Sequence, residues 1–283
     1  MNILDKLIKN SQDLSSKQQV VAKYILDNWE KAPFESAMVI AKKLNMSQSS
    51  VIRTIKALGF EGVPQFQHAL SDYIQRRLST TDRVDLSAPM DGNGIENAVG
   101  ITFSQAEENI RSALQNLALD DVRQLVSLIE KANRIYVIGM RSSASVAHFL
   151  GFNLNLLYHN TTILRSDDEL FETLRGMTSN DIVIAFSFSR YSKNTIEAAR
   201  YAQRFHGKII GVTDSLSSPL AGLCDILFVL PVISHHFTNS FAAVITFCDV
   251  ILRALLLTDR ASHKEKFKSL EADFKKLGTF DVM

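Results

Sequence analysis

Apolar residues recur at helical spacing through the first part of the chain. Over residues 1–79 they fall mostly three, four or seven positions apart, and no strand-like alternation interrupts them. The recurring positions are Val20, Val21, Tyr24, Ile25, Met38, Val39, Leu44, Val51, Ile52, Ile55 and Leu58. A one-sided apolar pattern of this period predicts amphipathic helices that bury that side. We therefore expect an all-α domain over residues 1–79.

The helical periodicity lapses over Ser79–Gly100. Small polar residues surround Pro89 and Gly92 there, a composition typical of loops. Helical spacing resumes over Glu96–Leu117. We assign residues 80–117 to a linker and a connecting helix.

A different pattern follows over residues 118–283, where short apolar runs alternate with amphipathic segments. The predicted strands are Arg134–Gly139, Thr161–Leu164, Asp181–Ser187, Lys208–Val212 and Asp225–Leu230. The predicted helices are Asp120–Lys131, Ser143–Tyr158, Asp168–Leu174, Thr195–Phe205, Ser218–Leu223 and the apolar Ser240–Leu257, before a Lys-rich helical tail. Continuous apolar strands between helices predict a doubly wound α/β domain with a five-stranded parallel sheet covered on both faces.

Composition excludes several classes of protein. Hydrophobic residues make up 46% of the chain and charged residues 22%, which is ordinary globular usage. Two cysteines do not support a disulfide scaffold or a Cys-based zinc site, and we expect no metal and no cofactor. The first residues lack the apolar run of a signal peptide, and charged Asp249 and Arg253 interrupt the longest apolar segment. We expect a cytoplasmic protein with no membrane contact.

Charge is divided unevenly between the two parts of the chain. Residues 1–79 hold 11 Lys and Arg against 7 Asp and Glu, whereas the remaining residues hold 20 against 23. A basic first part next to a mildly acidic second part favours nucleic acid as a partner of the first.

Residues 36–59 read as a helix-turn-helix. A first helix over Ser36–Leu44 contains the small Ala41, which allows close approach of a second helix. Ser47 is a good N-cap for that second helix, predicted over Gln48–Leu58, and Gly59 suits its left-handed end. The alternative is an ordinary helical hairpin with a polar outer face.

The second helix of this motif leaves a polar face outside. Short polar groups at its start suit base edges and phosphates, and Arg53 suits guanine O6 and N7 or a phosphate. The candidate DNA-contacting residues are Ser47, Gln48, Ser49, Ser50, Arg53, Thr54, Lys56, Lys42 and Lys43. The basic balance and the cap-turn-cap pattern favour duplex DNA over the hairpin alternative.

Serine-rich turns follow the first and third predicted strands, each directly before a helix. In a doubly wound sheet, ligands bind beyond the carboxyl ends of the strands, and helix N-termini favour anions. The candidate ligand-binding residues are Gly139, Arg141, Ser142, Ser143, Ser187, Ser189, Arg190 and Ser192. We expect a phosphate or carboxylate here; helix capping alone is the alternative.

The whole chain resembles the RpiR/MurR family of bacterial transcriptional regulators. In the first part the resemblance rests on the helix-turn-helix and on Leu58–Gly62 followed by Phe66. In the second part it rests on the segments Arg134–Gly139, Ser187–Ser189, Thr213–Ser215 and Ser218–Leu220 with Asp225. The resemblance implies a helix-turn-helix domain and a sugar isomerase (SIS) domain of flavodoxin-like strand order that senses a phosphosugar. It also implies a homodimer or higher homo-oligomer on a palindromic operator.

Two arginines depart from the patterns usual in SIS domains. Arg141 replaces the second glycine of G-x-G-x-S, and Arg190 replaces the glycine of S-x-S-G-x-T. Both replacements strain a backbone that needs positive φ, and both add a guanidinium. We hypothesise bidentate contacts to an anion more acidic than a hexose monophosphate; the alternative is that both side chains face solvent or a partner subunit.

The residues at the expected catalytic positions favour a sensor over an enzyme. The position that holds a glutamate base in many SIS isomerases is Asn194, which cannot act as a base; Glu197 lies three residues on. His235 and His236 remain candidates for an isomerase alternative. We predict a non-enzymatic regulator, with an aldose–ketose phosphosugar isomerase as the alternative and a pure interaction protein as a third possibility.

Overall fold

The computed structural model describes residues 3–12, 14–29, 32–77, 81, 83–84, 94–165 and 170–279. The chain forms two compact units. One comprises Met1–Ile101 with Ile233–Phe237, and the other comprises Thr102–Val232 with Thr238–Met283. Among the helices of the described ranges, none has both the length and the apolar composition needed to cross a membrane.

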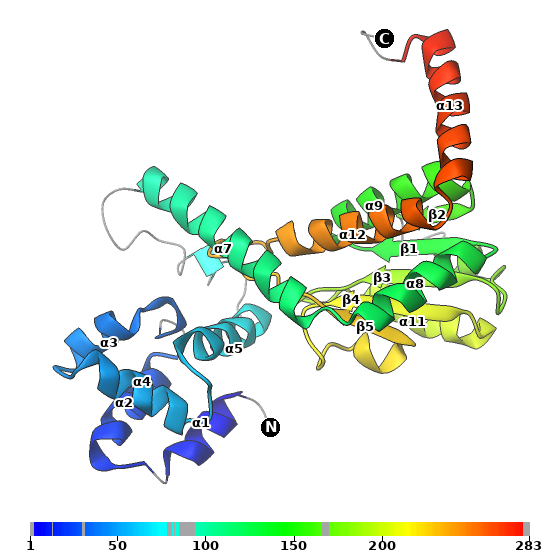
Figure 1. Ribbon diagram of the computed structural model, residues 1–283. Coiled ribbons are helices and arrows are strands. Elements are labelled where there is room, and N and C mark those ends of the chain that lie inside the picture. Colours follow the sequence, from blue (N-terminus) through cyan, green and yellow to red (C-terminus); the bar gives the residue numbers. More distant parts are fainter. Residues whose placement is uncertain are drawn as a thin grey trace. The chain divides into compact units, whose positions relative to one another are not determined.

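The N-terminal unit is helical in all its described elements (Figure 1). These are α1 (Ile3–Ser11), α2 (Ser16–Asp27), the 3-10 helix η1 (Ala32–Phe34), α3 (Ala37–Lys43), α4 (Gln48–Ala57) and α5 (Val63–Arg77). Helix α7 (Gly94–Asn116) follows and extends into the second unit. The predicted linker ends earlier than expected, because residues 94–100 are already helical; much of the rest of it lies outside the described residues.

Predicted apolar positions fill most of the core of this unit. Val21, Ile25, Val51 and Ile55 are fully buried, as the helical spacing requires. The expectation was wrong for three positions that are exposed instead, Val20, Met38 and Val39. Each lies next to a buried position in the sequence, at the edge of the apolar stripe, so residue type alone could not place it.

The second unit is a five-stranded parallel sheet in the order β2-β1-β3-β4-β5 (Figure 1). The strands are β1 (Ile135–Gly139), β2 (Thr161–Leu164), β3 (Ile182–Phe186), β4 (Lys208–Thr213) and β5 (Ile226–Val229). The helices are α8 (Leu119–Lys131), α9 (Ser143–Tyr158), α10 (Leu170–Leu174), α11 (Lys193–Ala202), η2 (Gln203–Phe205), η3 (Ala221–Leu223), α12 (Ala242–Thr258) and α13 (Arg260–Leu277). The predicted fold is confirmed, including the flavodoxin-like strand order.

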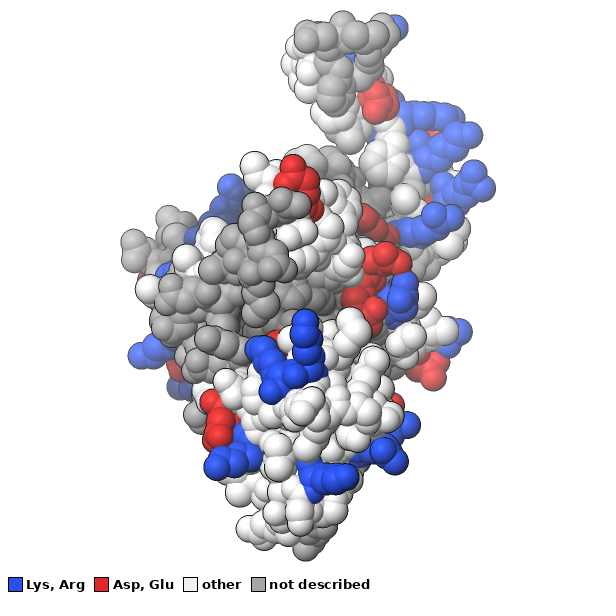
Figure 2. Space-filling model, turned by 90° about the vertical axis from the view of Figure 1, so that its left-hand side faces the viewer, with Lys and Arg blue, Asp and Glu red and all other residues white. Residues whose placement is uncertain are grey.

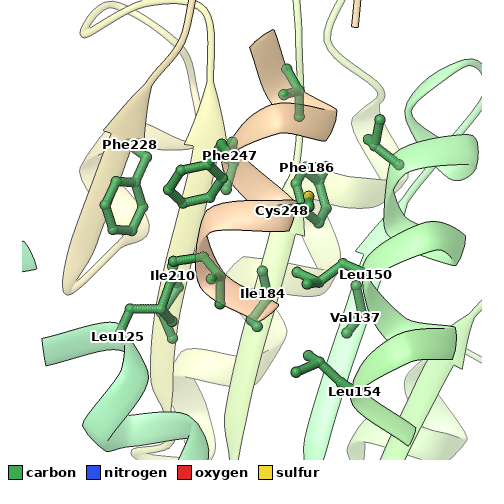
Figure 3. Close-up of a cluster of buried hydrophobic side chains, with 14 of the residues drawn as sticks. Leu125, Val137, Leu150, Leu154, Ile184, Phe186, Ile210, Phe228, Phe247 and Cys248 are labelled. Atoms are coloured by element: carbon green, nitrogen blue, oxygen red, sulfur yellow. The ribbon is translucent and has the colours of Figure 1, made fainter. Parts of the chain in front are cut away.

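Helices cover both faces of the sheet. The larger core lies between one face and helices α8, α9 and α12, where Phe228 and Phe247 pack with ring centroids 4.7 Å apart (Figure 3). The smaller core joins the other face to α10 and α11. Strands covered on both sides explain why their sequences read as unbroken apolar runs.

Strand register brings the carboxyl ends of three neighbouring strands level. Gly139, the last residue of β1, pairs with Phe186, the last residue of β3, and Phe186 pairs with Val212 of β4. The strand order reverses between β1 and β3, which is where open α/β sheets bind ligands. The loops after these strands therefore form one edge of the domain.

Candidate functional site

Local signals in the sequence build the helix-turn-helix. Ser36 and Ser47 cap α3 and α4, accepting hydrogen bonds from Val39 N (3.2 Å) and Ser50 N (3.3 Å). Between the helices, Asn45 takes the left-handed conformation at φ 51°. Gly59 ends α4 at φ 92°, a conformation that glycine adopts without strain. The predicted cap, turn and end residues are confirmed.

Helix α1 fixes the far end of α4. Asn10 donates a hydrogen bond through Nδ2 to the carbonyl oxygen of Leu58 at 2.8 Å, and Lys6 Nζ donates to that of Gly59 at 3.2 Å. These carbonyls belong to the end of α4, where backbone acceptors lack partners inside the helix. The first helix thereby holds α4 in place.

The outer face of α4 carries most of the predicted DNA-contacting side chains. Exposed on or beside it are Ser47, Gln48, Ser49, Arg53, Lys56, Lys42 and, in part, Lys43, while Ser50 is half-buried. Thr54 was wrongly expected outside: it is 1% exposed, and its hydroxyl donates to Ser50 O at 2.8 Å. A polar residue type does not place a threonine outside a helix, because its hydroxyl bonds readily to a carbonyl one turn back.

Lys43 differs from its neighbour Lys42. Its ammonium lies 2.5 Å from the buried carboxylate of Glu35 and 3.1 Å from the hydroxyl of Tyr24. Hydrogen bonding to Glu35, and then to Tyr24, raises the pKa of Lys43 above its usual value. Tyr24 also donates to Glu35 at 2.7 Å, so the three side chains tie α2 to α3. This network commits the Lys43 ammonium to Glu35, although 48% of the side chain remains exposed.

Basic side chains spread over the N-terminal unit. Its exposed cations include Lys9, Lys17, Lys23, Lys42, Arg53 and Lys56. On the face of the whole molecule drawn in Figure 2, Lys and Arg are spread out, with fewer Asp and Glu among them. Separate cations around an exposed polar helix suit contacts to individual phosphates of a duplex.

The junction of β1 and α9 forms the first half of the candidate anion site. Gly139 ends the strand so close to the helix that a Cβ there would lie 2.5 Å from Ser143 O. Ser142 is the N-cap residue of α9, but its side chain makes no capping hydrogen bond. Ser143 is buried and Arg141 is exposed. Ser143 N already donates to Met140 O at 3.2 Å and Ala144 N to Arg141 O at 3.1 Å, so within the described residues Ser142 N is the backbone donor left for an anion at this turn.

The junction of β3 and α11 forms the second half. Ser187, Ser189 and Thr195 are at most 6% exposed, and the hydroxyl of each has no hydrogen-bond partner among the described residues. A buried hydroxyl without a partner costs about 1–3 kcal/mol, so three together indicate a place for an oxygen-rich ligand. Ser192, the N-cap residue of α11, again makes no capping hydrogen bond.

Strand β4 supports this second loop. Asp214 accepts a hydrogen bond from Ser189 N at 3.1 Å, and the Thr213 hydroxyl donates to Ser187 O at 2.7 Å. Neither Asp214 nor Thr195 was among the predicted site residues. A polar Thr-Asp-Ser run directly after a buried strand was the available signal for Asp214, whereas Thr195 gave none.

Arg141 and Arg190 both occupy the left-handed region, with φ 56° and 65°. The backbone therefore keeps the conformation that suits glycine although an arginine stands at each position. This conformation costs an L-residue about 1–2 kcal/mol. Strain of this kind gathers at functional sites, and both arginines lie beyond the carboxyl ends of adjacent strands.

The residues considered for the isomerase alternative are Asn194, Glu197, His235 and His236. Asn194 lies in the first turn of α11, and Glu197 forms an ion pair with Arg200 at 2.8 Å on the same helix. Burial, and then the neighbouring His236, lower the pKa of His235; burial, and then Arg83, lower that of His236. Both imidazoles are thereby favoured in the neutral form.

Both parts of the chain match domains of known protein families. Residues 1–77 match the helix-turn-helix domain of the rpiR family, and residues 128–254 match the SIS domain. Over 97% of this chain and 95% of the relative, the sequence is 26% identical to the HTH-type transcriptional regulator HexR of Escherichia coli K12. These matches define an HTH-type transcriptional regulator with a SIS domain.

Solved structures show the same architecture. The sugar isomerase domain of an RpiR transcription factor from Sphaerobacter thermophilus matches with a TM-score of 0.59 and 26% identity, covering 62% of this chain and 97% of that one. The NanR protein of Vibrio vulnificus, complexed with ManNAc-6P, matches over 98% of this chain and 99% of that one, with a TM-score of 0.57 and 20% identity. The chain belongs to the RpiR/MurR family of transcriptional regulators.

Proposed function

We propose that this protein binds a palindromic operator through α4 and that a small anionic sugar metabolite, bound by the SIS domain, changes this binding. One observation carries the proposal: a single chain combines an exposed polar helix in a basic unit with three buried hydroxyls beside the β1–β3 switch point that have no partner among the described residues. The first suits duplex DNA and the second suits an oxygen-rich ligand.

The ligand would lie between the starts of α9 and α11. The backbone N–H of Ser142 and the hydroxyls of Ser187 and Ser189 suit a phosphate. The bound sugar phosphate in the NanR structure, whose fold this chain shares, is consistent with such a ligand. Arg141 and Arg190 supply cations for a second anionic group, so the favoured ligand is a phosphorylated sugar acid or a bisphosphate.

Coupling requires two arrangements of the chain with different affinities for the ligand. Two copies related by a two-fold axis would place their α4 helices in half-sites about 34 Å apart, or a multiple of that distance. The ligand would favour one spacing of the two helices over the other. Whichever spacing it favours, the operator affinity must then change on ligand addition.

Three measurements on the full-length protein test this function. Genomic fragments retained by the protein identify an operator, and a thermal-shift screen of sugar phosphates and sugar acids identifies a ligand. Adding that ligand should change operator affinity at least fivefold. No retained fragment, or an affinity unchanged by a bound ligand, contradicts the proposal. Turnover of a phosphosugar that is lost in His235→Ala supports the isomerase alternative.

The two lysines at the end of α3 give different predictions for the salt dependence of DNA binding. We expect Lys42→Ala to lower the slope of log affinity against log salt by about 0.9 per phosphate contact removed. Lys43→Ala should leave that slope unchanged, because Glu35 already holds its ammonium, but should destabilise the unit by about 2 kcal/mol. Anisotropy titrations at several salt concentrations and urea unfolding separate the two. Equal slope changes in both variants would show that Lys43 also contacts phosphate.

Replacing Arg141 with glycine should raise stability and weaken ligand binding at once. Removing the left-handed strain gains about 1–2 kcal/mol, and the extra backbone freedom of unfolded glycine offsets part of it, leaving about 0.5–1 kcal/mol. Loss of one guanidinium contact should lower ligand affinity about tenfold. His159→Gly is the matched control, because His159 has φ 55° at the opposite end of α9. Calorimetric titration showing unchanged affinity in Arg141→Gly removes this arginine from the site.

A further inference from the structure

An apolar hollow lies beside α4 in the N-terminal unit. Its volume is about 470 Å³, and its walls include Ala37 of α3, Ile52 of α4 and Val63 and Pro64 of α5. Gln48, the first residue of α4, also lines it, together with the polar residues Ser36 and Gln67. The hollow therefore adjoins the exposed helix face to which we assign DNA contacts.

Only one polar side chain of the hollow is uncommitted within the described residues. The hydroxyl of Ser36 caps α3 through Val39 N, and Gln67 donates through Nε2 to Glu35 O at 3.0 Å. The carboxamide of Gln48 is exposed and makes no hydrogen bond to the described part of the chain. Gln48 is thus the polar group that a molecule entering this hollow would meet.

The opposite flank of α4 is different in character. A second hollow of about 260 Å³ is lined there by Lys17, Arg53 and polar residues of α2 and α4. Two cations suit a phosphate of the DNA backbone. The apolar hollow holds no cation among its lining residues, so a phosphate does not suit it. The two sides of α4 therefore fit different parts of a duplex.

The functional groups of Gln48 and of the apolar wall indicate which base edge fits this side of α4. A carboxamide offers one donor and one acceptor side by side, which match N6 and N7 of adenine, and an apolar wall matches the methyl group of thymine. Ile52 follows Gln48 by four residues and so lies on the same side of the helix, about 6 Å along the axis. Gln48 and Ile52 therefore lie within about two base-pair steps of each other along the duplex, at about 3.4 Å per step.

We infer that Gln48 and Ile52 make this protein select an A·T pair in its operator, with Gln48 bonding adenine and the thymine methyl entering the apolar hollow. The inference rests on the proposed DNA binding and adds the base pair that is read. A G·C pair presents no methyl group in the major groove and mismatches the carboxamide.

The test uses full-length protein and duplexes that it selects from a random library. In the selected duplex, each thymine is replaced in turn by deoxyuridine, which lacks only the methyl group. At one position per half-site we expect three- to fivefold weaker binding, the worth of one buried methyl group. Changing that pair to G·C should weaken binding tenfold or more.

Two variants assign the effect to its residues. Gln48→Ala should lower the preference for A·T over G·C from tenfold or more to the three- to fivefold that the methyl group supplies. Ile52→Ala should bind the thymine and deoxyuridine duplexes alike. Ile52→Val, which keeps the packing, should retain discrimination between thymine and deoxyuridine. Lys17→Ala on the opposite flank is the control and should weaken all duplexes equally.

The possible failures are distinguishable. If the protein binds duplexes but tolerates deoxyuridine at every position, the inference is overturned and DNA binding stands. If Gln48→Ala and Ile52→Ala weaken all sequences equally, the hollow contacts the sugar backbone and the inference is again overturned. If no duplex is selected, the proposed function fails together with the inference.

Discussion

Replacing Gly139 with alanine should cost about 3 kcal/mol of folding free energy or more and abolish ligand binding. The added Cβ would lie 2.5 Å from Ser143 O and 2.9 Å from Ser143 C, both backbone atoms of the first turn of α9. Backbone cannot rotate away as a side chain can, so α9 must shift relative to β1. Ser142, the N-cap residue of this turn, carries the backbone donor proposed for the anion. Urea unfolding and thermal shift with ligand measure the two effects.

Gly222→Ala is the matched control for this substitution. Gly222 lies in the 3-10 helix η3 of the same unit, and a Cβ there would meet nothing within 4 Å. The control should change stability by less than about 1 kcal/mol and leave ligand binding intact. Equal stability of the two variants would mean that the start of α9 adjusts freely, and the proposed rigid anion site would lose its basis.

Replacing Ser187 or Ser189 with alanine should remove ligand binding without harming the fold. Each hydroxyl is buried and unpartnered among the described residues, so its loss leaves no new unsatisfied group. We expect the free energy of unfolding without ligand to stay level or rise by up to about 1 kcal/mol. A hydrogen bond to a charged ligand is worth about 1.5–3 kcal/mol, so affinity should fall about 10- to 100-fold.

Thr161→Val is the control for the two serine variants. The Thr161 hydroxyl is also buried without a partner among the described residues, but it lies at the start of β2, away from the carboxyl ends of the strands. Its removal should leave ligand affinity unchanged. A marked loss of stability in Ser187→Ala, with ligand affinity kept, would show instead that the hydroxyl supports the fold.

The elements of the α/β unit could be predicted because strands that are buried on both faces appear in the sequence as short, continuous apolar runs. Each predicted strand differs from the observed one by at most one residue at either end. The first unit was harder to resolve at single positions. Met38 is apolar but exposed, and Thr54 is polar but buried, because the edge of a helix stripe depends on what packs against it.

The candidate anion site could be predicted only in part. Serines before helices mark strand ends, and glycines replaced by arginine pointed to strain, which the positive φ values of Arg141 and Arg190 confirm. Thr195 gave no signal in the sequence, and the contact of Asp214 depends on which strands are neighbours in the sheet. Asp214 reaches Ser189 only because β4 pairs with β3.

The hydrogen bonds from α1 to the end of α4 have a practical consequence. Lys6 and Asn10 hold the Gly59 and Leu58 carbonyls, although about fifty residues separate them in the sequence. A purification tag fused ahead of α1, or a later start of translation, would disturb these hydrogen bonds. The position of the helix proposed to read DNA would then change, although every side chain proposed to face the groove is still present. Footprinting and promoter-titration work is therefore better done with the affinity handle at the other terminus.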